Sequence, residues 1–143
     1  VFLILGNGSL KRELEIKIHQ ENITNIILPG NVNNPINHLI ESDIYLSTSL
    51  YEGHPISVLE AMSSGLPIVA SNVTGNSETI IHGESGYLYK IGNILLAVKH
   101  ILRLSKNPNI RKSIGQNAKK RQKELFSISR MTEDHIKIYG EIT

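Results

Sequence analysis

Five short apolar runs, separated by segments with a helical pattern, constrain the fold more than any other feature of this chain. The runs are Phe2–Leu5, Asn25–Leu28, Ile44–Ser47, Pro67–Ser71 and Gly86–Tyr89. Each has the length of a strand, and the first suits a strand that is buried on both faces. Strands that alternate with helical crossovers form parallel sheets with right-handed connections and helices on both faces. The sequence therefore predicts a doubly wound, Rossmann-like α/β fold that binds ligands at the carboxyl ends of its strands.

Apolar residues at helical spacing mark the segments between these runs. Leu10, Leu14 and Ile18 recur among charged residues and predict an amphipathic helix. After Lys90 the pattern is helical to the end of the chain. We expect one domain over 1–143, with an α/β core over about 1–90 and a helical tail over 91–143. The helices are expected over about 9–20, 33–42, 55–64, 75–82, 94–102, 108–125 and 129–139.

The composition of the chain limits which partners it can bind and indicates the cellular compartment. A formal net charge of +2 and 5% aromatic residues offer little to a phosphate backbone or to stacked bases, so no nucleic acid is expected. The absence of cysteine removes thiolate chemistry and fits a reducing compartment. No apolar run has the length needed to span a bilayer, and we expect a cytoplasmic protein. The chain starts at Val1, without Met and inside a strand-like run, which we interpret as a piece of a longer protein.

The stretch that follows the third predicted strand, Tyr51 to Met62, carries most of the chemistry. Glu52 precedes a Gly-His-Pro turn, and Pro55 opens a helix-forming run that contains Glu60. Proline suits the first turn of a helix, because an N–H there would have no partner within the helix. The free amides and positive dipole end of that helix suit an anion such as a diphosphate. A carboxylate at Glu60 suits sugar or ribose hydroxyls instead.

Other interpretations stay open at this stage, both for the carboxylates and for a glycine-rich turn near the start of the chain. Gly6-Asn7-Gly8 matches the start of a dinucleotide fingerprint, but Lys11 replaces the third glycine and the acidic residue expected about twenty positions later is missing. A plain strand-to-helix turn is favoured there. Glu52 and Glu60 also fit the acid and nucleophile of a glycosidase, or two carboxylates that suit a helix dipole. The anion site between them favours group transfer over hydrolysis.

The sequence gives little support for a metal site or for the catalytic triad of a Ser-His-Asp hydrolase. Asp43 and Asp134 are the only aspartates, so there is no Asp-x-Asp pair, and His-Glu-x-x-His is absent. No metal site is therefore expected. Of the six histidines only His54 lies where a ligand contact is plausible, and a structural role is the alternative. Ser57 is the one serine or threonine of the Tyr51–Met62 stretch, and nothing resembles Gly-x-Ser-x-Gly.

Several motifs together resemble one known family. They are Glu52-Gly53-x-Pro55, Glu60-Ala61-Met62, Gly65-x-Pro67-Ile68-Val69-Ala70-Ser71, and the single residues Gly75, Glu78, Gly83 and Gly86. With seven residues between Glu52 and Glu60, the pattern resembles the carboxy-terminal domain of a GT-B glycosyltransferase. The group in question is the large retaining one of the family 4 or group 1 type, which includes sucrose, glycogen and bacterial polysaccharide transferases. The resemblance is strong over about Val1 to Tyr89 and weaker in the helical tail.

The resemblance implies that this domain binds a UDP-, GDP- or ADP-sugar without metal or another cofactor. The sugar would pass, with retention, to a glycan, lipid or other acceptor held by a separate amino-terminal domain. Carried over by position, Glu52 is the catalytic residue beside the donor sugar, and Glu60 binds the ribose hydroxyls. The other donor-binding positions are Gly53, His54, Pro55 and Ile56 around the sugar and diphosphate, Gly30, Asn31 and Val32 by the base, and Gly6 and Gly8 at the interdomain cleft.

This chain departs from the family pattern at several points. His54-Pro55 stands where many members have Phe-Gly, and Asn76, which tolerates the left-handed conformation, replaces a common second glycine. The family's Arg and Lys that neutralise the diphosphate, and its acceptor domain, would lie upstream of Val1. We therefore expect the piece to be inactive alone.

Two alternatives to the transferase are a GT-B sugar-nucleotide epimerase and a non-catalytic nucleotide-sugar-binding or interaction module on the same fold. A basic run in the helical tail is either a solvated helix face or a contact with anionic lipid at the inner face of the plasma membrane. The run consists of Arg111, Lys112, Lys119, Lys120, Arg121 and Lys123.

Overall fold

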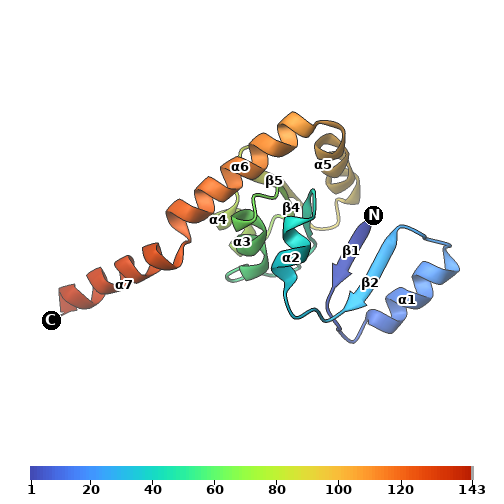
Figure 1. Ribbon diagram of the computed structural model, residues 1–143, viewed down its shortest axis with the longest axis horizontal. Coiled ribbons are helices and arrows are strands. Elements are labelled where there is room, and N and C mark those ends of the chain that lie inside the picture. The colour runs from blue at the N-terminus through green and yellow to red at the C-terminus, as the bar shows by residue number, and fades with distance from the viewer. Residues whose placement is uncertain (143) are drawn as a thin grey trace. The chain divides into compact units, whose positions relative to one another are not determined.

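The computed structural model describes residues 1–142, and its elements alternate between strands and helices as the sequence predicts (Figure 1). The chain divides into two compact units, Val1–Asn37 and His38–Thr143. Both sheets are parallel, which confirms the predicted α/β class. The strands hydrogen-bond as one sheet of two strands and one of three. The single domain expected over 1–143 stays a prediction, and each unit is described by itself.

The first unit is a β-α-β arrangement. Strand β1 (Phe2–Leu5) pairs in parallel with β2 (Ile26–Gly30), and α1 (Lys11–Gln20) connects them. Strand β1 was expected to be buried on both faces, but Phe2, Leu3 and Ile4 are each 40–43% exposed. The reason is that α1, the helix between the two strands, packs mainly on β2, so little of the unit covers the faces of β1. Helix α1 forms as predicted, but like β1 it has no buried residue.

The second unit is built on strands β3 (Tyr45–Ser47), β4 (Ile68–Ser71) and β5 (Gly86–Tyr89), in that spatial order. Strand β4 lies in the middle and is buried along its whole length, as its continuous apolar sequence requires. Three helices separate or precede these strands: α2 (Pro35–Ile40), which starts at the end of the first unit, α3 (Ile56–Ser63) and α4 (Thr74–Thr79).

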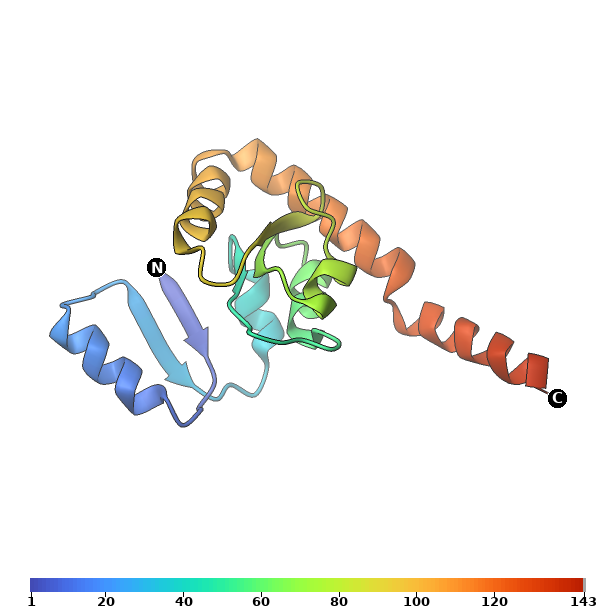
Figure 2. The same cartoon turned by 180° about the vertical axis from the view of Figure 1, so that it is seen from behind.

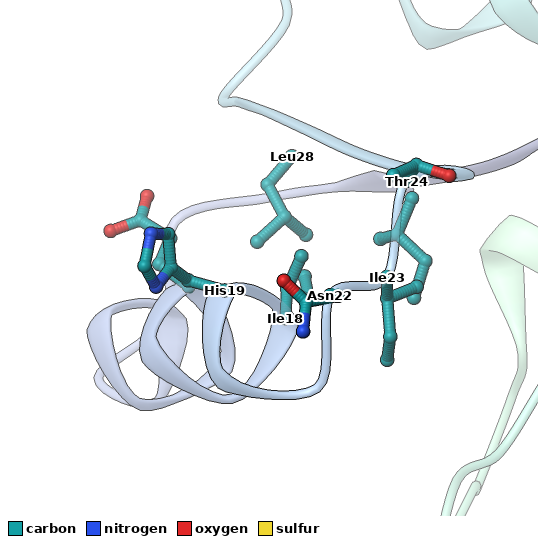
Figure 3. Close-up of a pocket in the computed structure, with 8 residues that line it drawn as sticks. Ile18, His19, Asn22, Ile23, Thr24 and Leu28 are labelled. Carbon is teal, nitrogen blue, oxygen red and sulfur yellow. The ribbon is translucent and has the colours of Figure 1, made fainter.

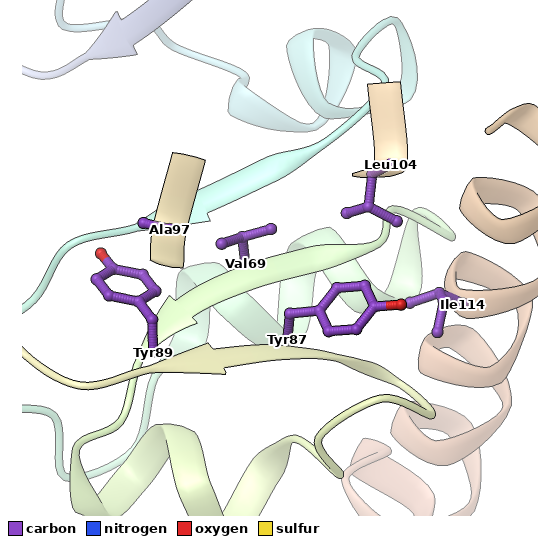
Figure 4. Packing of buried hydrophobic residues seen from close by; sticks show 6 residues of the cluster. All are labelled: Val69, Tyr87, Tyr89, Ala97, Leu104 and Ile114. Carbon is purple, nitrogen blue, oxygen red and sulfur yellow. The ribbon is translucent and has the colours of Figure 1, made fainter. Parts of the chain in front are cut away.

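A cluster of buried residues packs helix α5 (Ile94–Lys106) against β4 and β5 (Figure 4). Tyr87 and Tyr89 point to the same face of β5, since side chains two residues apart in a strand share a face. Val69 of β4 lies between them and the helices. The cluster consists of Val69, Tyr87, Tyr89, Ala97, Leu104 and Ile114.

Helix α3 forms the second half of the Tyr51–Met62 stretch and ends where the sequence predicts. Val58, Ala61 and Met62 are completely buried. Gly65 has a φ of 81°, and its amide donates to Met62 O at 2.9 Å while the amide of Leu66 donates to Ala61 O at 3.1 Å. These two bonds form a Schellman motif, which needs a residue that tolerates positive φ. The predicted end of the helix at Ser64-Gly65 is confirmed.

The carboxy-terminal part is helical, as expected. Helices α5 (Ile94–Lys106) and α6 (Pro108–Leu125) lie side by side, and α7 (Ile128–Ile142) follows them (Figure 2). Asn107 is the N-cap residue of α6 and Pro108 its first residue, as predicted. The side chain of Asn107 caps nothing there, however, and instead donates to Arg103 O at 2.8 Å. In the described part of the chain, no helix is both long and apolar enough to cross a bilayer.

Candidate functional site

Glu52 lies in the loop that leaves the carboxyl end of β3, which is where ligands bind in open parallel sheets. Its carboxylate is held by a neighbour in the same loop. The hydroxyl of Ser49 donates a hydrogen bond of 2.7 Å to Glu52 Oε1. Glu52 itself is half-buried. The predicted catalytic carboxylate is therefore partly buried and hydrogen-bonded at the strand end.

The main chain at Glu52 and Gly53 rests on helix α4. The amide of Gly75 donates to Glu52 O at 3.0 Å. A Cβ added at Gly75 would lie 2.7 Å from Gly53 O and 2.8 Å from Glu52 O, so only glycine allows this approach without a shift. Asn76, which follows, does not take the left-handed conformation, because it lies inside helix α4. Its buried side chain donates to Ser71 O at 2.9 Å.

The turn that opens α3 differs slightly from its prediction. Pro55 is the N-cap residue of α3, one position before the first helical turn, and its side chain is fully buried. The amide of Ile56 donates to His54 O at 2.9 Å. His54 and Ile56 are exposed. The next amides, at Ser57 and Val58, belong to the first turn, where amides have no acceptor within the helix. An anion therefore has donors available beside Gly53.

Glu60 lies on α3, half-buried, one turn and a half after Pro55. The charges of Glu60 and Glu52 both act on the phenol of Tyr45, the first residue of β3. The pKa of Tyr45 is raised, chiefly by burial; a hydrogen bond with Ser57 opposes the rise, and the negative charges of Glu52 and Glu60 add to it to a lesser extent. The two carboxylates thus act on one phenol, and the structure brings them into one neighbourhood of the second unit.

The remaining predicted positions belong to the first unit. The amide of Gly6 donates to Gly30 O at 2.8 Å, and that of Lys11 donates to Gly8 O at 3.1 Å. Gly6 and Gly30 have φ values of 122° and 84°, which favour glycine. A Cβ at Gly30 would lie 3.2 Å from Lys11 Nζ. Gly6, Gly8 and Gly30 therefore meet at one end of the β1–β2 sheet, with a lysine beside them, and Asn31 and Val32 follow Gly30 directly.

A separate cavity of about 440 Å³ opens in the first unit, between the end of α1 and β2 (Figure 3). Ile18, Ile23 and Leu28 supply its apolar wall, and His19 and Asn22 supply polar groups. It contains none of the residues that the sequence singled out as donor-binding. The cavity is therefore not part of the candidate site.

Two of the six residues of the basic run, Arg111 and Arg121, form hydrogen bonds that stabilise the fold. Arg121 of α6 donates to Thr79 O at 2.8 Å and to Glu78 O at 3.0 Å, and so covers carbonyls at the end of α4. Arg111 donates to Leu104 O at 3.2 Å and lies 3.3 Å from the carboxylate of Asp43. The other members, Lys112, Lys119, Lys120 and Lys123, are exposed. Among residues 1–142, no group of three or more His, Asp or Glu side chains could hold a metal ion.

Sequence reasoning missed the residues that support Glu52. Ser47, Ser49, Ser71 and Tyr89 form hydrogen bonds around its loop, and none of them was a predicted site residue. A signal was present, because Ser47, Ser71 and Tyr89 are the last residues of their strands. Hydroxyl-bearing side chains at three neighbouring strand ends indicate a shared polar edge.

This architecture is shared with solved glycosyltransferase structures. Over 96% of the chain, it superposes with a TM-score of 0.90 and 31% identity on 28% of a TarM variant from S. aureus, crystallised with fondaparinux, alpha-GlcNAc-glycerol and UDP. Its fold is thus that of the carboxy-terminal domain of a GT-B enzyme. Residues 1–121 match the model of the family described as Glycosyl transferases group 1, and the chain belongs to that family.

Two relatives of known name show how much of a longer protein the chain corresponds to. The chain is 33% identical over 107 residues, 73% of its length, to an Escherichia coli UDP-Gal:alpha-D-GlcNAc-diphosphoundecaprenol alpha-1,3-galactosyltransferase, of which the match covers 28%. It is 31% identical over 141 residues, 97% of its length, to a Staphylococcus aureus poly(ribitol-phosphate) alpha-N-acetylglucosaminyltransferase, of which the match covers 29%. The chain thus spans under a third of these relatives.

Proposed function

We propose that this chain is the donor-binding domain of a retaining glycosyltransferase that takes a sugar from a nucleoside-diphosphate sugar without a metal ion. One observation carries the proposal: Glu52 at the carboxyl end of β3 and Glu60 on the following helix bracket the start of α3, in a chain of the group 1 family. UDP is the favoured nucleotide, since one relative is named for UDP-Gal and one similar structure was solved with UDP.

Each group around the start of α3 has a chemical role in this proposal. The first amides of α3 and its positive dipole end face the diphosphate. Glu60 accepts hydrogen bonds from the ribose hydroxyls, because an ionised carboxylate is a pure acceptor. Glu52 lies beside the donor sugar, where a fixed negative charge stabilises the positive charge that develops at the anomeric carbon as the diphosphate leaves. Pro55, His54 and Ile56 shape the turn around the sugar.

The glycine-rich end of the first unit is assigned to the rest of the donor. Gly30, Asn31 and Val32 lie by the base in this proposal, and Gly6 and Gly8 line the cleft toward a second domain. Their support is local geometry, since Gly6 and Gly30 have positive φ and are joined by a 2.8 Å hydrogen bond. The acceptor, and the domain that holds it, belong to the parts of the relatives that this chain does not span.

A transferase is favoured over the two alternatives. The named relatives of the chain transfer sugars, whereas no residue of the site favours an epimerase over a transferase. A non-catalytic module would use Glu52, which accepts a 2.7 Å hydrogen bond from Ser49, for binding alone. Glu52→Gln separates the cases, because it removes the charge while keeping the shape: donor binding should persist and transfer in the full-length protein should fall by several orders of magnitude.

Nucleotide binding is the direct test of the donor site. The melting temperature of the chain should rise with UDP, and less with GDP or ADP, because a ligand that binds the native state stabilises it. Glu60→Ala should abolish the rise by removing the ribose contact. Glu124→Ala, a change at an exposed glutamate of α6, serves as the matched control and should leave it intact. No rise with any of the three nucleotides at millimolar concentration would count against the donor site.

Contact with anionic lipid is a separate proposal for the exposed lysines of α6. Lys112, Lys119, Lys120 and Lys123 remain available for it, since only the two arginines of the basic run serve the fold. Co-sedimentation should occur with vesicles rich in phosphatidylglycerol and not with pure phosphatidylcholine, and it should decrease with salt. Equal behaviour with both vesicles would rule the contact out.

A further inference from the structure

The carboxylate of Glu52 makes a single hydrogen bond within the part of the chain that the structure describes. Ser49 Oγ donates to Glu52 Oε1 at 2.7 Å, a short distance for a hydroxyl and a carboxylate. No other described group is bonded to this carboxylate. One oxygen is thus occupied by the protein, and the other is left for a ligand.

Ser49 is itself held from two sides. The hydroxyl of Ser71, the last residue of β4, donates to Ser49 O at 2.6 Å. The hydroxyls of Ser47 and Ser49 lie 3.3 Å apart. Tyr89, the last residue of β5, donates to Ser47 O at 3.0 Å. All three strand ends of the sheet therefore contribute to the position of Ser49.

The direction of these bonds follows from proton counting. A serine hydroxyl has one proton, and that of Ser49 is used for Glu52. The proton between Ser47 and Ser49 must then come from Ser47, so Ser47 donates to Ser49 and Ser49 donates to Glu52. Donors in such a series polarise one another toward the negative charge at the end. The series ends at Glu52 Oε1.

We propose that Ser49 is a positioning residue for the donor sugar: it holds Oε1 of Glu52 so that Oε2 faces and accepts a sugar hydroxyl. This inference rests on the proposed function and assigns a role to a residue that does not touch the donor. A glutamate side chain that is already ordered loses less rotamer freedom when the sugar binds. Removing the Ser49 hydroxyl should therefore weaken binding of the sugar and leave the nucleotide contacts unchanged.

The test compares ligands that share a nucleotide and differ by the sugar. Dissociation constants for UDP, UDP-galactose and UDP-N-acetylglucosamine are measured by calorimetry for the wild type and for Ser49→Ala. We expect Ser49→Ala to weaken the better-bound UDP-sugar by about three- to tenfold and to leave the affinity for UDP within twofold. Ser49→Thr keeps a hydroxyl and should restore most of the loss. Ser42→Ala, which removes an exposed hydroxyl bonded to His38 O, is the matched control.

The outcomes separate this inference from the proposed function. Equal loss of UDP and UDP-sugar in Ser49→Ala would mean that Ser49 maintains the whole loop, and would overturn a positioning role. Unchanged affinity for both would overturn it as well, as would a failure of Ser49→Thr to restore binding. In each of these cases wild-type UDP binding keeps the proposed function standing. A wild type that binds no nucleotide refutes the proposed function, and this inference with it.

Discussion

The amide of Gly75 donates a 3.0 Å hydrogen bond to the carbonyl oxygen of Glu52, and the two main chains approach too closely for any side chain at position 75. Glu52 leaves the end of β3, whereas Gly75 lies in the first turn of α4 after β4. The contact therefore joins two loops at the carboxyl edge of the same sheet. The position of the catalytic candidate depends on a residue without a side chain, more than twenty positions away in sequence.

Gly75→Ala should destabilise the second unit by about 1–3 kcal/mol, because the new methyl group would lie 2.7 Å from Gly53 O and must displace the loop. Urea denaturation measures the loss. Gly140→Ala is the matched control, since an added Cβ there meets nothing within 4 Å and alanine favours a helix. Equal stability of the two variants would show that the loop moves aside freely.

Gly115→Ala tests the packing of α6 against the end of α3. Alanine is the better helix former by about 1 kcal/mol, but its Cβ would collide with the carbonyl oxygen of Gly65. Backbone atoms cannot give way cheaply, so we expect a net loss of about 1–3 kcal/mol in thermal or urea unfolding. Ser113→Ala, at an exposed position of the same helix, should stay within about 0.5 kcal/mol of the wild type. A stabilised Gly115→Ala would contradict the close packing.

Tyr89→Phe removes the hydroxyl that donates to Ser47 O at 3.0 Å. Tyr89 is 7% exposed, so the carbonyl oxygen loses its partner in a buried place. The free energy of unfolding should fall by about 1–2 kcal/mol. Tyr51→Phe changes the same chemical group at a residue that is 80% exposed and should have little effect. Similar losses in both variants would mean that the buried bond contributes nothing specific.

Acid should destabilise the second unit through His100. This residue is 8% exposed and stacks on Tyr87 with 4.6 Å between ring centroids. Burial lowers the pKa of His100 below its ordinary value of 6.5, and the charges of His82, Arg103 and Lys99 lower it further. The unfolded chain then binds a proton that the folded chain does not, so stability is lost as pH falls below about 6.5.

The slope from this one group is at most about 1.4 kcal/mol per pH unit, and it ends below the lowered pKa of the folded state. His100→Phe keeps the aromatic stack and removes a ring nitrogen, Nε2, that has no hydrogen-bond partner among the described residues. Its unfolding free energy should therefore change less between pH 7 and pH 5 than that of the wild type. Parallel pH curves for the two proteins would contradict a role for His100.

Arg121→Lys should cost about 1–2 kcal/mol, although it conserves the charge. Arg121 bonds two carbonyl oxygens at the end of α4 at once, at 2.8 and 3.0 Å, and an ammonium group cannot reproduce that fork. Differential scanning calorimetry gives the change. In the matched variant Arg130→Lys, an exposed ion pair with Asp134 is altered, and we expect less than about 0.5 kcal/mol.

Local pattern was sufficient for most of the elements. The Ser64-Gly65 signal marks the end of α3, and Asn107-Pro108 marks the start of α6, because each depends on the backbone preferences of the residues involved. The same reasoning failed for burial in the first unit. An apolar strand such as Phe2–Leu5 predicts cover on both faces, but that cover must come from elements elsewhere in the chain.

By itself, the sequence determined the α/β class, the family and the two carboxylates around the start of α3, because periodicity, turn residues and motif spacing are local properties. Only the tertiary structure decided how Glu52 is held. Ser49, Ser71 and Tyr89 meet there through the parallel pairing of β3, β4 and β5. Gly75 reaches the same loop from α4. Such contacts depend on which strand ends become neighbours, and strand order is a property of the packed sheet, which no short stretch of sequence contains.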